Sequence, residues 1–195
     1  MRSVYGFVVA PKGERYNNVK KVGENELILN SEIYNHQFIN REAIVKSIPI
    51  ATQSDIEVGD TVIVHHNVFR RWHNQRGIEM NSSSYFNEEN YIVFSDQIFA
   101  IKKGDKWKPL DGYCFVQPLK EDNKLLNQKE KLMGIVRYTD GTVKNDQVVG
   151  FKEQGKFEFV IDEQRLYRVK SNLITTIYEH QGNEEKYNPS WAQSS

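Results

Sequence analysis

The sequence contains one cysteine, Cys114, among its 195 residues. An intramolecular disulfide is therefore impossible, and a structural zinc site has no thiolate partners. Because Cys114 lies in the apolar run GYCFVQPL, we expect it to be a small buried residue of the core or of a sheet. A lone buried thiol suits a reducing compartment.

The chain also lacks net charge and long apolar runs. Its 26 basic residues balance 26 acidic ones, which argues against a general polyanion binder but leaves room for a local basic patch. The N-terminal run MRSVYGFVVA is broken by Pro11, so it is too short for a secretion signal, and no segment suits a membrane span. We therefore expect a cytoplasmic protein.

Helical periodicity is scarce. Only residues 123–134, NKLLNQKEKLMG, place leucines at helical spacing, and Gly134 ends that pattern quickly. Short runs rich in Val, Ile, Phe and Tyr, bounded by Gly, Asn, Asp and Pro, recur instead and are typical of strands. The sequence thus predicts an all-β fold.

Two phrases, ENYIVFSDQIFAI and QRLYRVKSNLITT, repeat one pattern at an offset of 75 (166 − 91), which pairs Tyr91 with Leu166. Three more blocks recur in the same order: YGFVVAPK with YCFVQPLK at 108, REAIVKSI with KLMGIVRY at 91, and VGDTVIVHH with NDQVVGFKE at about 86, through Asp60 and Asp146. The alternative is that the two halves resemble each other by chance, because strands are built from few residue types. The shrinking offset favours a second copy with shorter loops.

Each copy contains around five short strands without a helical crossover, which favours an antiparallel barrel that hides its edges by closure. We predict two tandem small antiparallel β-barrels with long loops. The first spans residues 1–108, with a long loop at 12–40 and a hairpin insertion at 73–90. The second spans 109–180, and a polar tail follows at 181–195.

VGDTVIV (58–64) and YIVFSDQIFAI (91–101) resemble the Gly-Asp turn and the closing strand pair of the GroES-type co-chaperonins. REAIVKSI and YGFVVAP occupy the places of two further strands of that family. The second half repeats the pattern, with its Gly-Asp turn degraded to NDQ (145–147). The resemblance covers most of residues 4–178 as two tandem GroES-like units. The long loops are more similar to those of bacteriophage-encoded members, which implies a host cytoplasm.

The resemblance implies a mobile loop, here residues 12–40, whose apolar tripeptide docks on a GroEL-type chaperonin. The tripeptide is Leu27, Ile28 and Leu29. Three consecutive aliphatic side chains between polar residues are, independently of the family, unusual in a solvated loop. The alternative is that they form an ordinary strand packed on the barrel.

The corresponding loop of the second copy, residues 120–131, offers only Leu125 and Leu126, so we expect a weak docking element or none. The family's ring is sevenfold, and two barrels per chain do not fill seven places with a whole number of chains. Seven chains that each contribute one copy, or a mismatched ring, are the two solutions. Several loops on one ring would bind with avidity, so we expect a homo-oligomer.

The stretch HHNVFRRWH (65–73) has the most reactive composition in the chain. A metal site needs ligands that converge in space. In a strand, His65 and His66 point to opposite faces, so at most one of them joins His73. We therefore expect no metal site.

Within the same stretch, Arg70, Arg71 and Trp72 suit either a nucleic-acid patch or a protein interface. Aromatic and arginine side chains stack on bases, but Glu79 and Glu88 lie nearby in the sequence. Interfaces are also enriched in Arg and Trp, and we favour an interface.

No Gly-rich phosphate loop, nucleophile elbow or H-E-x-x-H pattern occurs. The carboxylates Asp60, Asp96, Asp146 and Asp162 lie at expected turns, where Asp is favoured. We therefore expect a protein that is not an enzyme and needs no cofactor. The leading hypothesis is a co-chaperonin that encloses client polypeptide, such as a phage capsid protein. The alternatives are a structural or assembly module and a small nucleic-acid-binding barrel.

Overall fold

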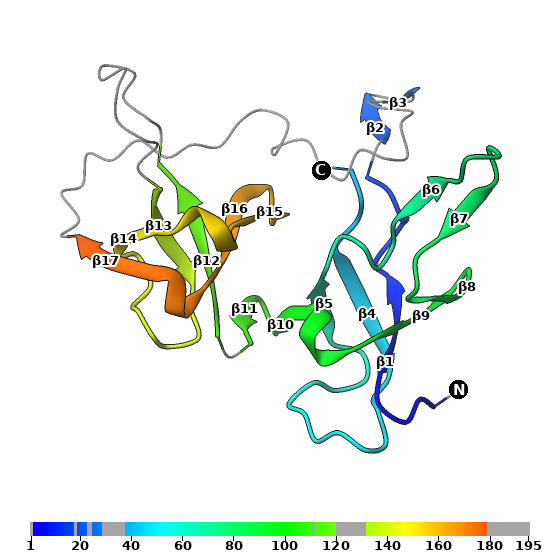
Figure 1. Ribbon diagram of the computed structural model, residues 1–195, viewed down its shortest axis with the longest axis horizontal. Coiled ribbons are helices and arrows are strands. Elements are labelled where there is room, and N and C mark those ends of the chain that lie inside the picture. The colour runs from blue at the N-terminus through cyan, green and yellow to red at the C-terminus, as the bar shows by residue number, and fades with distance from the viewer. Residues whose placement is uncertain are drawn as a thin grey trace. The chain divides into compact units, whose positions relative to one another are not determined.

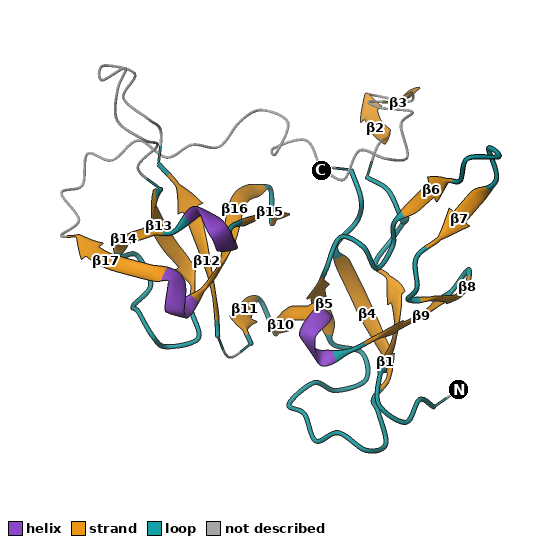
Figure 2. Ribbon diagram, viewed as in Figure 1, coloured by secondary structure: helices purple, strands orange, loops and turns teal. Residues whose placement is uncertain are grey.

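The computed structural model describes residues 2–17, 19–22, 25–28, 38–110, 112–119 and 132–178. Strands dominate these residues, with three single-turn 3-10 helices between them (Figure 2). The predicted all-β class is therefore confirmed. The chain divides into two compact units, Met1–Trp107 and Lys108–Ser195. No helix in the described ranges has the length and apolar character needed to cross a membrane.

The described residues of the first unit contain eleven strands, most of which belong to one sheet. The strands of this sheet are β1 (Phe7–Pro11), β4 (Glu42–Ser47), β5 (Thr61–Val64), β8 (Tyr85–Asn87), β9 (Asn90–Val93), β10 (Ile98–Lys103) and β11 (Lys106–Pro109), and η1 (Ser95–Gln97) joins β9 to β10. Their order is β11-β10-β5-β4-β1-β9-β8 (Figure 1). Two hairpins stand outside the sheet: β2 (Val19–Val22) with β3 (Asn25–Ile28), and β6 (Arg71–His73) with β7 (Glu79–Asn81).

The second unit contains a six-stranded sheet. Its strands are β12 (Tyr113–Pro118), β13 (Met133–Tyr138), β14 (Val148–Phe151), β15 (Phe157–Ile161), β16 (Gln164–Lys170) and β17 (Ile174–Tyr178), with short 3-10 helices η2 (Glu153–Gly155) and η3 (Ser171–Leu173). Their order is β15-β16-β12-β13-β14-β17. Of the segment with helical spacing, Met133 and Gly134 lie in β13, and 123–131 fall outside the described residues.

The two sheets share one strand order. Strands β8, β9, β1, β4, β5 and β10 correspond in turn to β15, β16, β12, β13, β14 and β17, and the first sheet adds β11 beside β10. Neither sheet closes into a barrel within the described residues, so the predicted closure is not found there. The edge strand β8 is short, with three residues, and a short edge also limits edge-to-edge pairing.

Hydrogen-bond registers show which residues of the two sheets correspond. Val9 pairs with Val45 beside a bulge, and Val116 pairs with Val136 beside a matching bulge. The second strands keep the predicted offset of 91 (136 − 45), but the first strands are offset by 107 (116 − 9), so the predicted 108 is wrong. The reason is that β12 is buried on both faces. Its residues are therefore apolar at successive positions, and the sequence of β12 aligns with that of β1 at either of two registers.

The turn before the third strand also shifts by one residue. Glu57 donates its backbone N–H to the Asp60 carboxylate at 2.8 Å, and Lys144 donates its own to the Gln147 side chain at 2.8 Å. Asp60 therefore corresponds to Gln147, at an offset of 87 (147 − 60), and its predicted pairing with Asp146 is wrong. Asp146 instead takes the left-handed backbone position of the glycine in the first turn, with φ of 63°.

The closing strands are shifted in the same way. Ile98 pairs with Val64 in the first sheet, and Ile174 pairs with Phe151 in the second. The offset is 76 (174 − 98), and the predicted 75 is wrong. The strands before the 3-10 helices have the same offset of 76 (167 − 91), since Val9 pairs with Tyr91 and Val116 pairs with Tyr167. The block order is nevertheless the one that the sequence indicated.

Each unit has its own apolar core. In the second, Cys114 is fully buried, as predicted, and lies in a cluster with Val116, Val136 and Val169. On the opposite face of β12, the ring of Phe115 meets Phe159 edge to face, with centroids 5.8 Å apart. In the first, the largest fully buried side chains are Phe7, Ile63, Phe69, Tyr91, Ile98, Phe99 and Ile101.

Candidate functional site

Two segments of the connection between β1 and β4 pair with each other next to the first sheet. We call the paired segments 14–17 and 38–41 the neck. Tyr16 and Ile39 form an antiparallel bridge across it, and the Asn40 N–H donates to the Arg15 carbonyl at 2.9 Å. Tyr16 and Ile39 are both buried, so the neck is a packed element at the base of the predicted docking loop.

Asn40 holds the two sides of the neck together. Its side chain is buried, and its Nδ2 donates to the carbonyl oxygens of Lys12 at 2.9 Å and Glu14 at 2.8 Å. Its Oδ1 accepts the backbone N–H of Glu42 at 2.9 Å. Both donors and one lone pair of the amide are therefore used, as a buried polar group requires.

Arg15 connects the neck to the hairpin β6–β7. Its Nη2 donates to the carbonyl of Phe69 at 3.2 Å and to the side chain of Asn81 at 2.9 Å. Its guanidinium also lies 5.4 Å from the ring centroid of Tyr91. Burial raises the pKa of Tyr91 to about 12, and the nearby Arg15 charge opposes that rise. The phenol therefore stays neutral beneath the cation.

Arg71, in β6, also contacts the neck. Its backbone N–H donates to the Tyr16 hydroxyl at 2.9 Å, and its guanidinium lies 5.0 Å from that ring centroid and 3.3 Å from Glu79. Trp72 follows Arg71 in β6 and therefore points to the other face of the hairpin, where Met80 is its cross-strand partner. The Arg70 guanidinium lies 5.9 Å from the centroid of the Trp72 ring. The three residues predicted as one patch are thus divided between two faces.

Beyond the neck, the loop continues as the hairpin β2–β3. Val19 pairs with Ile28 and Lys20 pairs with Leu27, so two of the three predicted docking residues lie in β3. Leu29 lies outside the described residues. β3 is a strand, as the alternative predicted, and it pairs with β2. Packing of this strand on the barrel stays a prediction.

The second unit has the matching connection between β12 and β13. The Leu119 N–H donates to the Met133 carbonyl at 3.3 Å, which is the same rung that Lys12 and Glu42 form in the first unit at 2.9 Å. Leu125 and Leu126, the second candidate docking element, lie outside the described residues.

His65 and His66 are placed differently from the sequence prediction. Their rings stack with centroids 4.2 Å apart, because β5 ends at Val64 and both residues lie in the turn after it. The prediction that they point to opposite faces is therefore wrong. His73 lies on β6. Within the described ranges, no three His, Cys, Asp or Glu side chains gather as a metal site would require.

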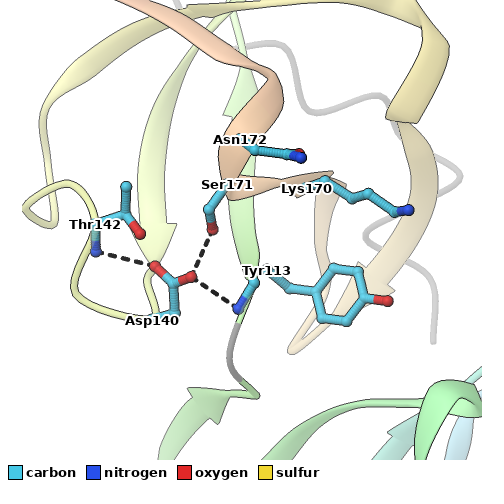
Figure 3. Close-up of a pocket in the computed structure, with 7 residues that line it drawn as sticks. Tyr113, Asp140, Thr142, Lys170, Ser171 and Asn172 are labelled. Carbon is cyan, nitrogen blue, oxygen red and sulfur yellow. Dashed lines mark hydrogen bonds between the residues drawn. The ribbon is translucent and has the colours of Figure 1, made fainter.

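An open pocket of about 600 Å³ lies in the second unit and is lined by Gly112, Tyr113, Asp140, Thr142, Lys170, Ser171 and Asn172 (Figure 3). The Asp140 carboxylate accepts the backbone N–H groups of Gly112 and Thr142, each at 2.9 Å, and the Ser171 hydroxyl at 2.6 Å. Burial disfavours the ionised form, but these hydrogen bonds outweigh it and lower the pKa of Asp140 below its ordinary value.

The side chains of Tyr113 and Lys170 extend away from Asp140 (Figure 3). The polar groups of the pocket therefore do not converge on one point, as a catalytic site requires. Through its hydrogen bonds, Asp140 instead holds together the start of β12, the turn at 139–142 and η3.

No protein-family model matches the chain, and no curated protein matches it at a significant level. Sequence reasoning missed Asn40, Arg15 and Asp140. The signals available for them were weak: Asn40 ends an Asn-rich segment directly before a strand, and Asp140 stands in TDGT, a turn sequence.

Proposed function

We propose that the chain is a co-chaperonin, built as two tandem GroES-like small β-barrels, that caps a GroEL-type chaperonin through Leu27, Ile28 and Leu29. The chain itself is neither an enzyme nor a cofactor binder, and the chaperonin hydrolyses the ATP. Several chains form a ring that encloses client polypeptide in the cytoplasm, a phage capsid protein being one such client. The strand order shared by the two sheets supports the tandem arrangement.

The observation that carries the proposal is the structure of one connection, the one between β1 and β4. In the first copy, the chain between β1 and β4 forms a buried neck and then a separate hairpin. A two-stranded hairpin alone is marginally stable in water. Here a packed neck leads to such a hairpin, in a connection whose sequence carries three consecutive aliphatic residues. This arrangement suits an element that becomes stably ordered when it binds a partner.

Magnitudes agree with weak docking by each loop. Burial of each aliphatic side chain contributes about 1.5 to 3 kcal/mol, while ordering the chain costs about 1 to 2 kcal/mol for each residue fixed. The neck lowers that cost because its residues are already ordered. Strong capping then depends on several loops that bind together.

The test is co-sedimentation of the protein with a GroEL-type chaperonin and nucleotide. Wild type should associate, and Ile28→Asp should lose association by about tenfold or more, because a carboxylate cannot enter an apolar groove. Ile50→Asp is the matched control, since Ile50 is 67% exposed outside the docking loop. If wild type fails to associate, even with the chaperonin of its natural host, the proposal is wrong. If Ile28→Asp associates equally well, only the loop assignment is wrong.

The second candidate is a structural or assembly module that makes no contact with a chaperonin, because one fold can have several unrelated functions. It predicts a stable homo-oligomer in sedimentation velocity that never binds a chaperonin. The third candidate, a nucleic-acid-binding barrel, predicts salt-sensitive binding that is lost in Arg70→Ala. Arg71 is a poor probe for it, because Arg71 supports the neck.

A further inference from the structure

Within the described residues, one face of the hairpin β6–β7 carries apolar side chains that are partly or largely exposed. Directly opposed residues of an antiparallel pair share a face, so Trp72 and Met80 lie together, and Ile78 lies two residues from Met80 on the same side. Ile78 is 57% exposed and Met80 is 40% exposed. The opposite face, with Arg71 and Asn81, is the one that contacts the neck. We call Arg70, Trp72, Arg76, Ile78 and Met80 the hairpin patch.

The hairpin is held in shape before any partner arrives. At its tip, the Asn74 Oδ1 accepts the backbone N–H groups of Arg76 at 2.9 Å and Ile78 at 3.0 Å. Gly77 takes the left-handed conformation that this turn requires, with φ of 75°. At its base, Arg15 donates to Asn81. Because the turn and the base are both tied, binding to the patch costs little ordering of backbone.

The charges of the hairpin are separated between its faces. Its only acid, Glu79, forms an ion pair with Arg71 on the neck side. Arg70 lies over Trp72, and Arg76 is exposed at the tip, and within the described residues no ion pair joins either to a carboxylate. The patch is therefore both apolar and cationic, and a complementary surface is apolar and anionic.

Two observations favour a polypeptide over a nucleic acid. Arg70 lies over the Trp72 ring, so the ring face that a base would stack on is shared with a cation. Ile78 and Met80 supply aliphatic and thioether surface, which offers nothing to phosphates or bases but buries well against apolar side chains. Two arginines are also too few for the basic track of a single-strand binder.

We propose that the hairpin patch is a docking surface for an acidic polypeptide segment that carries an apolar side chain. The apolar side chain packs between Trp72, Ile78 and Met80. Carboxylates that flank it pair with Arg70 and Arg76. This surface lies outside the loop that the proposed function uses, so the two proposals stand or fall separately.

The test uses the full chain and a fluorescein-labelled synthetic peptide in which Glu and Asp flank a central Leu-Phe-Leu. Binding is followed by fluorescence anisotropy, without any chaperonin. Wild type should bind the peptide, and Arg70→Glu/Arg76→Glu should weaken binding by about tenfold or more. The same variant should gain binding to a counterpart peptide with Lys in place of each acid. Met80→Ser should weaken binding without reversing the charge preference.

Matched controls separate the patch from general surface effects. Lys46→Glu/Lys144→Glu reverses two exposed charges elsewhere, and Ile50→Ser removes an aliphatic side chain of similar exposure. Both should bind the acidic peptide as wild type does, and circular dichroism checks that every variant is folded. The proposal is overturned if the acidic peptide does not bind, if the controls weaken binding as much as the patch variants, or if only a single-stranded oligonucleotide binds.

Discussion

Among single residues of the neck, Asn40 makes side-chain hydrogen bonds to three other residues. Asn40→Ala would leave two carbonyl oxygens and one N–H, at Lys12, Glu14 and Glu42, without their partner. We expect a loss of about 2 to 3 kcal/mol in the free energy of unfolding, because unsatisfied buried polar groups are costly. Urea unfolding measures this loss.

Asn67→Ala is the control for that change, because Asn67 is exposed in the turn after β5. It should change the unfolding free energy by less than about 0.5 kcal/mol. Equal urea midpoints for Asn40→Ala and wild type would show that water replaces the amide and that the neck is not a packed element.

Asp140 predicts a pH dependence with a definite sign. Its pKa is lowered in the folded protein, so the ionised carboxylate stabilises the fold. That stabilisation is fully present above the pKa of the unfolded chain, about 4, and is lost as pH falls through the lower folded value. Asp140→Asn should cost about 1.5 to 3 kcal/mol at neutral pH, and the difference from wild type should shrink below about pH 4.

Urea unfolding of wild type and Asp140→Asn between neutral pH and pH about 3 measures this difference. Asp105→Asn, in the exposed turn after β10, is the control and should follow wild type throughout. A difference that stays constant over the whole range would mean that the charge of Asp140 contributes nothing and that only its shape matters.

At the scale of elements, β10 and β17 form a matched pair for one substitution. Ile101 and Ile177 occupy the same register position, opposite Val62 and Val149. Ile101 is 1% exposed, in a strand with β11 beside it, whereas Ile177 is 57% exposed. Ile101→Lys should therefore cost about 3 kcal/mol or more, because it buries an unpaired charge, and Ile177→Lys less than about 0.5 kcal/mol.

Thermal and urea unfolding of the two lysine variants decide the outcome. If Ile177→Lys destabilises the protein as much as Ile101→Lys, then β17 is covered in solution by a further segment or by another copy of the chain. Sedimentation velocity distinguishes these cases, since loss of an interface between copies also lowers the oligomeric state.

The elements were more predictable than their registers. Period-2 patterns and turn residues indicate strands locally, and the order of repeated blocks carried over to both sheets. The register of β12 could not be obtained from residue identity, because both of its faces are buried and the alternation that fixes a register is lost. The His65 and His66 stacking was missed because the end of β5 depends on pairing with distant strands.

The candidate site was predictable only in part, for a similar reason. Three aliphatic residues in a polar segment point to the loop between β1 and β4 directly. The neck depends on contacts across long stretches of sequence: Arg15 and Asn81 are 66 residues apart, and Asn40 and Lys12 are 28 apart. Local patterns carry no information on such pairs, so the side chains that shape the site became visible only in the structure.

At the scale of the whole molecule, each unit has its own sheet and its own buried core, so each should unfold as a separate cooperative step. Ile101→Lys should lower only the transition of the first unit, and Asp140→Asn only that of the second. A loss of about 2 kcal/mol in a domain of this size lowers its midpoint by roughly 10 °C. Hydrogen exchange with mass spectrometry assigns each transition, because peptides from β4 and β5 report on the first unit and peptides from β12 and β13 on the second. Faster exchange in both sets of peptides from either substitution would show that the units fold as one body.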